Sequence, residues 1–327
     1  MRSLRSSRPP PAMLILQTPR LRLRWFAQSD AGFMRRLLND PGWIANIGDR
    51  GVHTRKQAAH WIQSRHVATY GRLGFGFWAV ERLADDALIG MCGLIQRDSL
   101  PEVDLGYALL PRFRGQGYAR EAAAACLRYA HDVLGLAEVW GITGPDNAGS
   151  AAVLQQIGLR DDGIRRLPGD DRETWVFRAP TRDLGDDHAQ IDALVRRFFA
   201  AFTNRDGIIP TLAALPHYFA LDAVIRVSDP LGTVTATDVH GFVGPRAELL
   251  LGGRLRDFEE HETEDRTDIA GAIAQRWLRY EKRGTLDGQS FEGGGTKAML
   301  FTKTRRGWKI ASLAWQDDAP APGKRAG

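Results

Sequence analysis

The stretch PRFRGQGYARE, residues 111–121, decides how the first half of this sequence is interpreted. It joins an apolar segment with strand character, 103–110, to an alanine-rich helical segment, 119–133. The free N–H groups and the dipole at the start of a helix attract anions. Gly115 and Gly117 let the backbone approach a phosphate without interference from a Cβ atom. The stretch therefore predicts a site for a phosphate-bearing ligand, with charge-assisted hydrogen bonds from three arginines: Arg112, Arg114 and Arg120.

Two common phosphate-binding motifs do not fit this stretch. The Rossmann fingerprint needs a third glycine and a following βαβ unit, and the P-loop needs Gly-Lys followed by Ser or Thr. A glycine turn that carries solvated arginines is the alternative that the stretch alone leaves open.

The positive charge is unevenly distributed along the chain. The sequence has 44 Lys and Arg against 39 Asp and Glu, with 25 against 19 through Asp183 and 19 against 20 after it. A protein that binds nucleic acid carries a denser basic stripe, so nucleic acid is excluded as a partner. The modest positive field of the first half suits a small polyanion. No run of about 18 apolar residues occurs, which excludes a membrane span.

A length of 327 residues predicts two domains. Residues 13–180 alternate strand and helix patterns, which indicates an α/β domain with a mixed sheet flanked by helices. A polar segment punctuated by glycine, 181–187, is the predicted linker. Residues 188–318 start with two helical segments and continue as strands, which indicates an α+β domain. Residues 1–12 and 319–327 are predicted to be disordered tails.

The two cysteines, Cys92 and Cys126, both lie in apolar surroundings. They are predicted to be buried reduced thiols rather than a disulfide, which points to the cytoplasm. The first dozen residues lack the apolar region of a secretory signal. Met1 and Met13 both stay open as the start of the chain.

Two further motifs lie on either side of the glycine-rich stretch. Asp104-Leu105-Gly106-Tyr107 begins the preceding strand, and Asn147-x-x-Ser150 opens a later helix. In this order, with Arg112-x-x-Gly115-x-Gly117 between them, the motifs resemble those of the GNAT acetyltransferases. TPRLRLRWF, residues 18–26, also resembles the branch of ribosomal-protein alanine acetyltransferases of the RimJ/RimL type. The resemblance covers about residues 14–178 and implies the GNAT fold, an α/β domain with a splayed mixed sheet.

The resemblance implies that acetyl-CoA, as a co-substrate, lies in a splay between strands 103–110 and 138–143. Its pantetheine arm would bond to the backbone near residues 107–110, and its pyrophosphate to the N–H groups of residues 114–119. The residues implied to bind it are Tyr107, Leu109, Leu110, Arg112, Arg114, Gly115, Gln116, Gly117, Tyr118, Ala119, Asn147 and Ser150.

The resemblance also implies direct attack of an amine on the thioester, with no acyl-enzyme. Asp104 takes the position of the general base, with Glu102 as a reserve, although aspartate is one methylene shorter than the usual glutamate. Ser150 is implied to hydrogen-bond the leaving thiolate, because Leu154 stands where many relatives have tyrosine. As alternatives, Asp104 is a solvated strand carboxylate, and Asn147 and Ser150 form an ordinary first helical turn.

The acceptor site is expected in residues 43–61 and the aromatic side chains near them. An α-amine with a pKa of about 8 is roughly 10% neutral at pH 7, whereas a lysine at about 10.4 is only ~0.04% neutral. The N-terminus of a protein or peptide, or a small-molecule amine, is therefore the expected acceptor. Lining candidates, which could equally be core residues, are Trp43, Trp61, Phe77 and Trp78. No metal site is predicted, and no role is assigned to His53, His60 and His66.

Residues from about 185 to 318 resemble the cone-shaped α+β fold shared by nuclear transport factor 2, ketosteroid isomerases and SnoaL-like cyclases. The resemblance implies a pocket inside the cone, with Asp222, His261, Trp277 and Tyr280 as candidate residues. Ser312 and Ala314 stand where relatives often carry histidines, which weakens the case for catalysis. Binding of an apolar small ligand or homodimerisation is favoured, with an added catalytic site or a plain scaffold as alternatives. The glycines at 293–295 are predicted to form a turn between strands.

The sequence thus predicts an acetyl-CoA-dependent N-acetyltransferase with a second, ligand-binding or dimerising domain. One alternative is a binding protein that senses an acyl-CoA. Another is a bifunctional protein whose second domain is an isomerase or cyclase.

Overall fold

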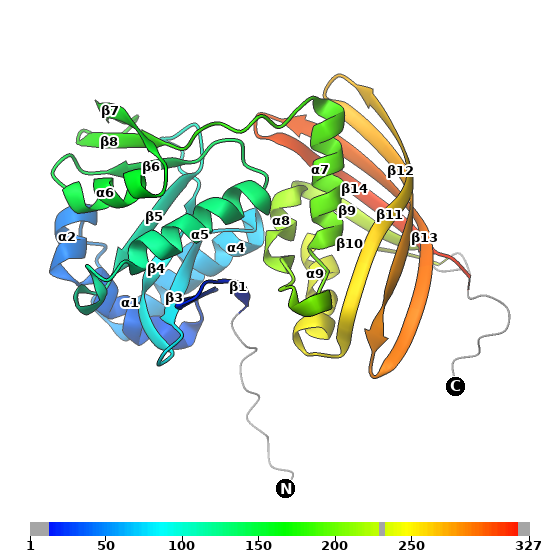
Figure 1. Cartoon of the computed structure of the whole chain (residues 1–327), viewed down its shortest axis with the longest axis horizontal. Helices are drawn as coiled ribbons and strands as arrows, with labels where there is room; N and C mark the ends of the chain where they lie inside the picture. Colours follow the sequence, from blue (N-terminus) through cyan, green and yellow to red (C-terminus); the bar gives the residue numbers. More distant parts are fainter. Residues whose placement is uncertain (1–12, 229–232, 320–327) are drawn as a thin grey trace, which may run out of the picture.

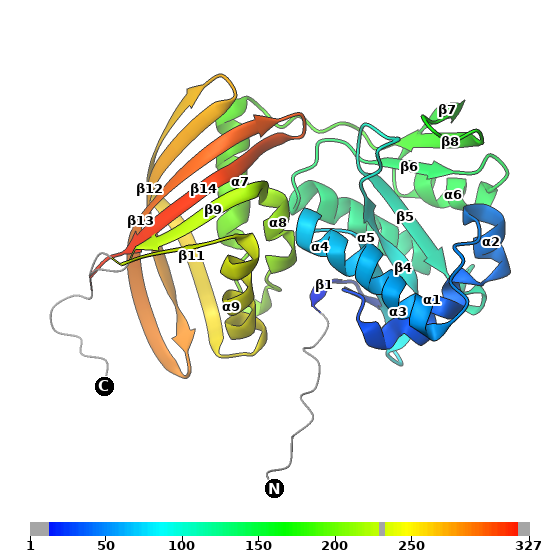
Figure 2. The same cartoon turned by 180° about the vertical axis from the view of Figure 1, so that it is seen from behind.

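The computed structural model describes residues 13–228 and 233–319, and it contains two β-sheets that lie side by side (Figure 1, Figure 2). The predicted tails, 1–12 and nearly all of 319–327, lie outside the described residues. The first sheet has eight strands in the order β1-β2-β3-β4-β5-β6-β8-β7. Their bounds are Leu14–Gln17 (β1), Leu21–Arg24 (β2), Phe77–Arg82 (β3), Ala87–Ile95 (β4), Asp104–Leu109 (β5), Trp140–Thr143 (β6), Arg160–Arg166 (β7) and Glu173–Arg178 (β8).

Helices cover both faces of this sheet (Figure 1, Figure 2). The alanine-rich α5 packs closely because small side chains line its buried face, among them Ala122, Ala123 and Ala130. Thr54 caps α3 through a reciprocal pair of hydrogen bonds with Gln57. The helices are Ala31–Leu38 (α1), Pro41–Ile47 (α2), Arg55–Trp61 (α3), Ala68–Leu73 (α4), Tyr118–Asp132 (α5) and Ala148–Gln156 (α6).

The first sheet opens between β5 and β6. These two parallel strands pair only at Asp104–Trp140 and Leu105–Gly141, and every other neighbouring pair in the sheet is antiparallel. Beyond these two residue pairs the strands diverge, so the far half of β5 has no partner on this side. The splay therefore leaves backbone hydrogen-bonding groups of β5 open to a ligand.

The second sheet has six strands in the order β10-β9-β14-β13-β12-β11, and it curves around α7 and α9 (Figure 1, Figure 2). Among the described strands of this sheet, only β9 and β14 pair in parallel. The strands are Phe219–Ser228 (β9), Val234–Thr237 (β10), Leu255–Ala270 (β11), Ile273–Leu286 (β12), Gln289–Thr304 (β13) and Gly307–Asp317 (β14). The helices are Asp187–Ala200 (α7), Leu215–Tyr218 (α8) and Val239–Leu251 (α9).

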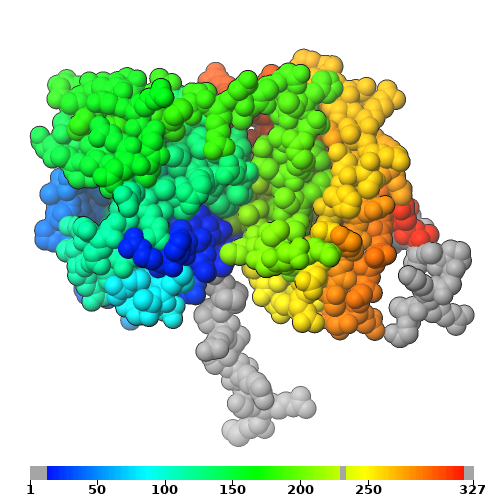
Figure 3. All heavy atoms as spheres, viewed as in Figure 1, coloured from blue at the N-terminus to red at the C-terminus, as the bar shows by residue number. Residues whose placement is uncertain are grey.

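The two halves share one continuous hydrophobic core and lie against each other (Figure 3). The hydroxyl of Tyr218, in α8, donates to the carbonyl of Val133, just after α5, at 2.7 Å. Gly135 faces Arg197 of α7, and a Cβ there would lie 2.5 Å from the guanidinium carbon. Residues 180–186, which connect the halves, contain neither helix nor strand. The predicted domain boundary falls in this segment.

The structure corrects one turn and adds elements that the sequence pattern did not reveal. The glycines at 293–295 lie inside β13 and pair with β12, so the predicted turn is wrong. A Cβ at Gly295 would lie 2.6 Å from the Tyr280 hydroxyl, so close packing rather than chain reversal requires glycine there. Helices α2 and α9 and strands β7 and β10 were not predicted.

Cys92 and Cys126 are buried free thiols, as predicted, with their sulfur atoms 3.5 Å apart. Among the residues that the structure describes, no helix has the length and apolar character needed to cross a membrane.

Candidate functional site

The glycine-rich stretch forms a loop of free backbone donors ahead of α5. Gly115 and Gly117 adopt φ values of 72° and 79°, in the left-handed region that favours glycine, and Gly117 is the N-cap of α5. The N–H groups of residues 115–120 have no acceptor within the described chain. Six free donors at the positive end of a helix form a ready anion site.

A network that the sequence analysis missed holds this loop in place. Glu121, in the first turn of α5, accepts hydrogen bonds from the side chain of Thr18 at 2.6 Å and from Arg20 Nε at 2.5 Å. Arg20 also donates to the carbonyl of Gln116 at 3.1 Å and lies 4.5 Å above the ring of Tyr118. These contacts join segments about one hundred residues apart, so no local motif could have indicated them.

The three arginines of the loop differ in availability. Arg112 lies over the ring of Phe113, and Arg120 is exposed with no ion pair among the described residues. Arg114 is already engaged, because its guanidinium donates to the carbonyl of Leu109 at 2.9 Å and to Asp40. Its N–H group donates to Pro111, so the predicted row of free N–H donors begins at residue 115 and not at 114.

Asp40 connects the loop to the unpredicted helix α2. Its carboxylate accepts from the N–H of Trp43, which caps α2, and from Arg114. Arg114 therefore fixes the position of α2 beside the loop. Trp43, Asn46 and Ile47 of α2 then form one wall of the cavities described below.

A cavity of about 650 Å³ extends from the loop into the splay. It is bordered by the start of α5, by β5 and by one face of α6. The predicted residues that line it are Tyr107, Leu109, Arg114, Gly115, Gly117, Tyr118, Ala119, Asn147 and Ser150. Gln116 and Arg112 lie outside its lining, where the Gln116 amide donates to the Arg112 carbonyl at 2.8 Å.

The backbone of β5 presents its donors to the splay at alternate residues. The N–H of Leu110 donates to the carbonyl of Ile89 at 2.9 Å, on the β4 side. Because alternate N–H groups point to opposite sides of a strand, those of Tyr107 and Leu109 face the splay. Leu110 does not offer the free backbone groups that the predicted site requires, since its N–H donates to the carbonyl of Ile89 and its own carbonyl accepts from the N–H of Phe113.

Tyr107 and Ser150 form a pair of hydroxyl groups where β5 meets α6. The Tyr107 hydroxyl lies 2.9 Å from Ser150 Oγ and donates to the Ser150 carbonyl at 2.8 Å. Burial raises the pKa of Tyr107 to about 12, so it is protonated at neutral pH. Asn147 caps α6 by accepting from the N–H of Ser150 at 3.1 Å. The sequence predicted a role for the backbone of Tyr107 only and gave no indication of a role for its hydroxyl.

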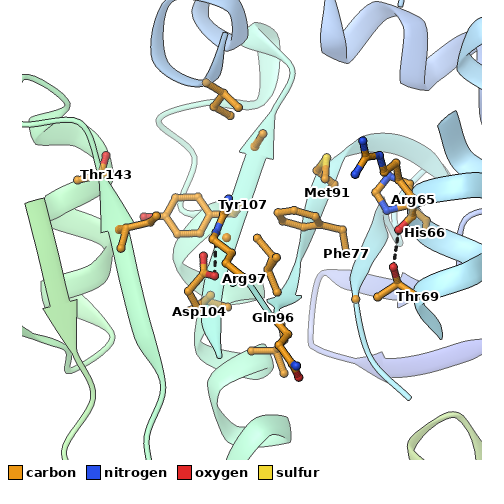
Figure 4. Close-up of a pocket in the computed structure, with 18 of the residues that line it drawn as sticks. Arg65, His66, Thr69, Phe77, Met91, Gln96, Arg97, Asp104, Tyr107 and Thr143 are labelled. Carbon is orange, nitrogen blue, oxygen red and sulfur yellow. Dashed lines mark hydrogen bonds and ion pairs between the residues drawn. The ribbon is translucent and has the colours of Figure 1, made fainter. Parts of the chain in front are cut away.

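Asp104 lies at the bottom of a second cavity, of about 510 Å³, and is 1% exposed (Figure 4). Its Oδ1 accepts from Arg97 Nε at 2.9 Å, and its Oδ2 has no donor among the described residues. Burial raises the pKa of Asp104 to about 6, against the opposing effect of Arg97. A carboxylate with this pKa and a free oxygen can accept a proton near neutral pH. Glu102, the predicted reserve, borders a different cavity, between the two sheets.

The two cavities of the first half meet at the splay. They share seven residues: Trp43, Asn46, Ile47, Tyr107, Ala108, Asn147 and Ser150. The smaller cavity is also lined by Trp61 and Phe77, as predicted, whereas Trp78 is fully buried in the core. Four arginines stand at its rim, Arg50, Arg65, Arg72 and Arg97, and Asp104 is the one carboxylate among the described residues that line it.

No group of three or more potential metal ligands occurs among the described residues. His66 lines the smaller cavity, and burial lowers its pKa to about 4, so its ring is neutral at pH 7 (Figure 4).

Comparisons with known proteins assign the family. The sequence profile described as "Acetyltransferase (GNAT) domain" matches residues 20–160. The N-acetyltransferase YnaD of Bacillus subtilis (strain 168) is 30% identical over 149 residues, which cover 46% of this chain and 84% of YnaD. The chain belongs to the GNAT acetyltransferase family. It is an N-acetyltransferase, and its co-substrate is acetyl-CoA.

Two further similarities concern the same half of this acetyltransferase. The protein YkkB of Bacillus subtilis (strain 168) is 29% identical over 147 residues, or 44% of this chain and 84% of YkkB. A solved acetyltransferase from Agrobacterium tumefaciens str. C58 is 27% identical, with a TM-score of 0.44, and the alignment covers 54% of this chain and 98% of that chain.

The larger cavity of the acetyltransferase fits acetyl-CoA. Six unpaired N–H groups match a pyrophosphate, and the open edge of β5 offers donors and acceptors to a pantetheine amide. The cavity continues to Tyr107 and Ser150, where the smaller cavity begins.

Three of the four candidate residues in the second half do not line its cavity. His261 and Trp277 are exposed on strands, and Asp222 borders the cavity between the sheets. Tyr280 is buried and lines the internal cavity, as predicted.

Proposed function

We propose that the enzyme transfers an acetyl group from acetyl-CoA to a primary amine that enters the smaller cavity. The observation that carries this proposal is the junction of the two cavities at Tyr107, Asn147 and Ser150, with Asp104 at the bottom of the acceptor side. The pyrophosphate would be held by the N–H groups of residues 115–120 and by Arg120. The acceptor amine would enter past α2 and the arginine rim.

Proton transfer in this proposal uses one group on each side of the reacting carbonyl. The amine nitrogen forms a bond to the acetyl carbon, the carbon–sulfur bond breaks, and Asp104 takes the proton that the nitrogen loses. The Tyr107 hydroxyl turns its proton from the Ser150 carbonyl to the departing thiolate, as a hydrogen bond or by proton transfer. An N–H of β5, at Tyr107 or Leu109, polarises the thioester carbonyl.

The arginine rim favours an anionic acceptor. Arg50, Arg65 and Arg72 have no carboxylate within ion-pair distance among the described residues. Burial lowers the pKa of Arg50, and Arg97, Arg172 and Arg65 lower it further, which supports a positive potential at the rim. An acceptor with carboxylates beside its amine would relieve this repulsion and associate faster. An acidic peptide N-terminus or an amino acid-like amine fits this requirement.

The acceptor preference is testable with three peptides that begin with alanine and continue with acidic, neutral or basic residues. We expect the highest kcat/KM for the acidic peptide. The double variant Arg65→Gln, Arg72→Gln should lower kcat/KM for the acidic peptide about 10-fold and leave the neutral peptide unchanged. Arg128→Gln, an exposed arginine on α5 away from both cavities, is the control. A uniform loss across all three peptides would contradict the charge selection, and catalytic silence with tight coenzyme A binding would favour an acyl-CoA sensor.

We propose that residues 188–318 form a second domain of the nuclear transport factor 2-like type. The curved sheet that wraps around α7 and α9, with a cavity on its inner face, supports this assignment (Figure 1). The cavity on the inner face of the sheet supports a ligand-binding role.

The outer face of the second sheet supports a homodimer. Trp277, Leu300 and Val224 are 49%, 53% and 36% exposed, on the face turned away from α7. The register places Val224, Ser312, Leu300 and Gln275 in one row across four strands, with Trp277 in the next row. An apolar patch on the open outer face of a sheet is suited to pack on a second copy.

Trp277→Lys should convert a dimer into a monomer, measured by light scattering after size-exclusion chromatography. Ile164→Lys, at an exposed position of β7 in the first sheet, should leave the dimer intact. A wild-type protein that is monomeric at micromolar concentration would refute the dimer.

A further inference from the structure

The second half contains a cavity of about 330 Å³ between α7, α9 and the inner face of the curved sheet. Aromatic rings dominate its lining: Phe198, Phe202, Phe242, Phe258, Phe291 and Trp315. Neighbouring rings make edge-on contacts, such as Phe242 with Trp315 at 5.7 Å and Phe202 with Phe242 at 5.8 Å. Such a lining binds a flat apolar body by burial and ring packing.

Four ionisable side chains along one wall of this cavity already form ion pairs. Lys297, 5% exposed, donates to Glu260 at 2.7 Å and lies 3.5 Å from the centre of the Tyr280 ring. Lys282 donates to Asp317 at 2.7 Å, and the Tyr280 hydroxyl donates to the same carboxylate. Each of these two pairs has a net charge of zero, so neither pair attracts a charged ligand.

Arg246 of α9 is a charged side chain of this cavity that belongs to neither ion pair. Its guanidinium lies 4.0 Å above the ring of Phe242 and 5.2 Å from that of Trp315. One of its N–H groups donates to the carbonyl of Phe242 at 3.0 Å, and no carboxylate of the described residues lies within ion-pair distance. Burial lowers the pKa of Arg246, and the more distant Glu260 and Asp317 offset this effect only in part.

A partly buried guanidinium without a carboxylate in ion-pair contact is unfavourable, and a ligand can supply that carboxylate. The planar guanidinium has free N–H donors in a geometry that matches a carboxylate. We propose that this cavity is a binding site for a small aromatic monocarboxylate, whose carboxylate pairs with Arg246 and whose ring packs among the phenylalanines and Trp315. The lining has three cationic side chains and two carboxylates, so one bound anion would balance the charge of the cavity. The proposal rests on the ligand-binding role proposed for residues 188–318 and not on acetyl transfer.

The test uses calorimetric titration of the full chain with benzoate, 2-naphthoate and indole-3-acetate, and with the matching carboxamides. We expect at least one carboxylate to bind, and its own carboxamide to bind at least about 10-fold more weakly, since a hydrogen-bonded charge pair is lost. Arg246→Met keeps the apolar volume and should remove this difference between acid and amide. Arg226→Met, at an exposed arginine on β9, should not.

The outcomes separate this proposal from those on which it depends. Equal binding of acid and amide by the wild-type protein would overturn the carboxylate assignment and leave the ligand-binding role intact. Absence of binding by every probe, with a folded protein, would overturn both. Acetyl transfer is measured independently, so its failure would leave this test unaffected. A thermal melt of Arg246→Met that matches the wild type excludes misfolding as the cause of a loss.

Discussion

A double variant, Gly115→Glu with Gly117→Glu, is expected to weaken acetyl-CoA binding at least about 100-fold, since each charge-assisted hydrogen bond contributes roughly 1.5–3 kcal/mol. Two carboxylates would enter the loop whose N–H groups are free from residue 115 to 120. They would repel the phosphates and compete for the same donors. Isothermal titration with acetyl-CoA measures the loss directly.

The control for this variant separates backbone strain from the loss of the anion site. Gly163 and Gly169 also have positive φ, 87° and 76°, and a Cβ at either would meet open space. Glutamates at both positions impose the same left-handed strain at a distance from the two cavities. We expect the control to bind acetyl-CoA with wild-type affinity. Equal affinities for all three proteins would show that the phosphates bind elsewhere.

Asp104→Asn is expected to lower kcat/KM by about 10²–10⁴-fold, the range typical of a lost general base. Affinity for acetyl-CoA should stay unchanged, because the larger cavity does not include Asp104. Compared with the unfolded chain, the folded protein stabilises the neutral carboxyl of Asp104, since the pKa of this group is raised to about 6. A neutral amide is therefore compatible with the site, and the thermal midpoint should change little.

Glu102→Gln is the comparison that tests the assignment of the base. Glu102 borders the cavity between the sheets and is expected to contribute little to transfer. Steady-state kinetics with the acidic peptide compare the two variants. A larger loss for Glu102→Gln than for Asp104→Asn would reverse the assignment.

The parts of the site that depend on local sequence could be predicted. Gly115 and Gly117 are required by the backbone of one short loop, and their positive φ values confirm why glycine stands there. Asn147 caps α6 and orients Ser150, again through neighbours in sequence. The splay followed from the resemblance, and the pairing of β5 with β6 confirms it.

The contacts that depend on distant residues could not be predicted. Arg114 looked available for phosphate, but its partner Asp40 lies 74 residues away in the chain. Arg20 and Glu121, which support the loop, are 101 residues apart. The same limit applies in the second half, where Lys297 and Glu260 become partners only when β11 to β13 assemble.

The pH dependence of kcat/KM tests most directly whether Asp104 is the base. The acceptor should be an amine whose own pKa lies below that of Asp104, so that it stays neutral across the titration. Because Asp104 must be ionised to accept a proton, and its pKa is raised to about 6, kcat/KM should be constant above that pH and fall about 10-fold per unit below it. The kcat/KM of Asp104→Asn should not show this fall at low pH. A wild-type profile that stays flat through pH 5 to 7, about one unit on either side of that pKa, would contradict the proposed role of Asp104.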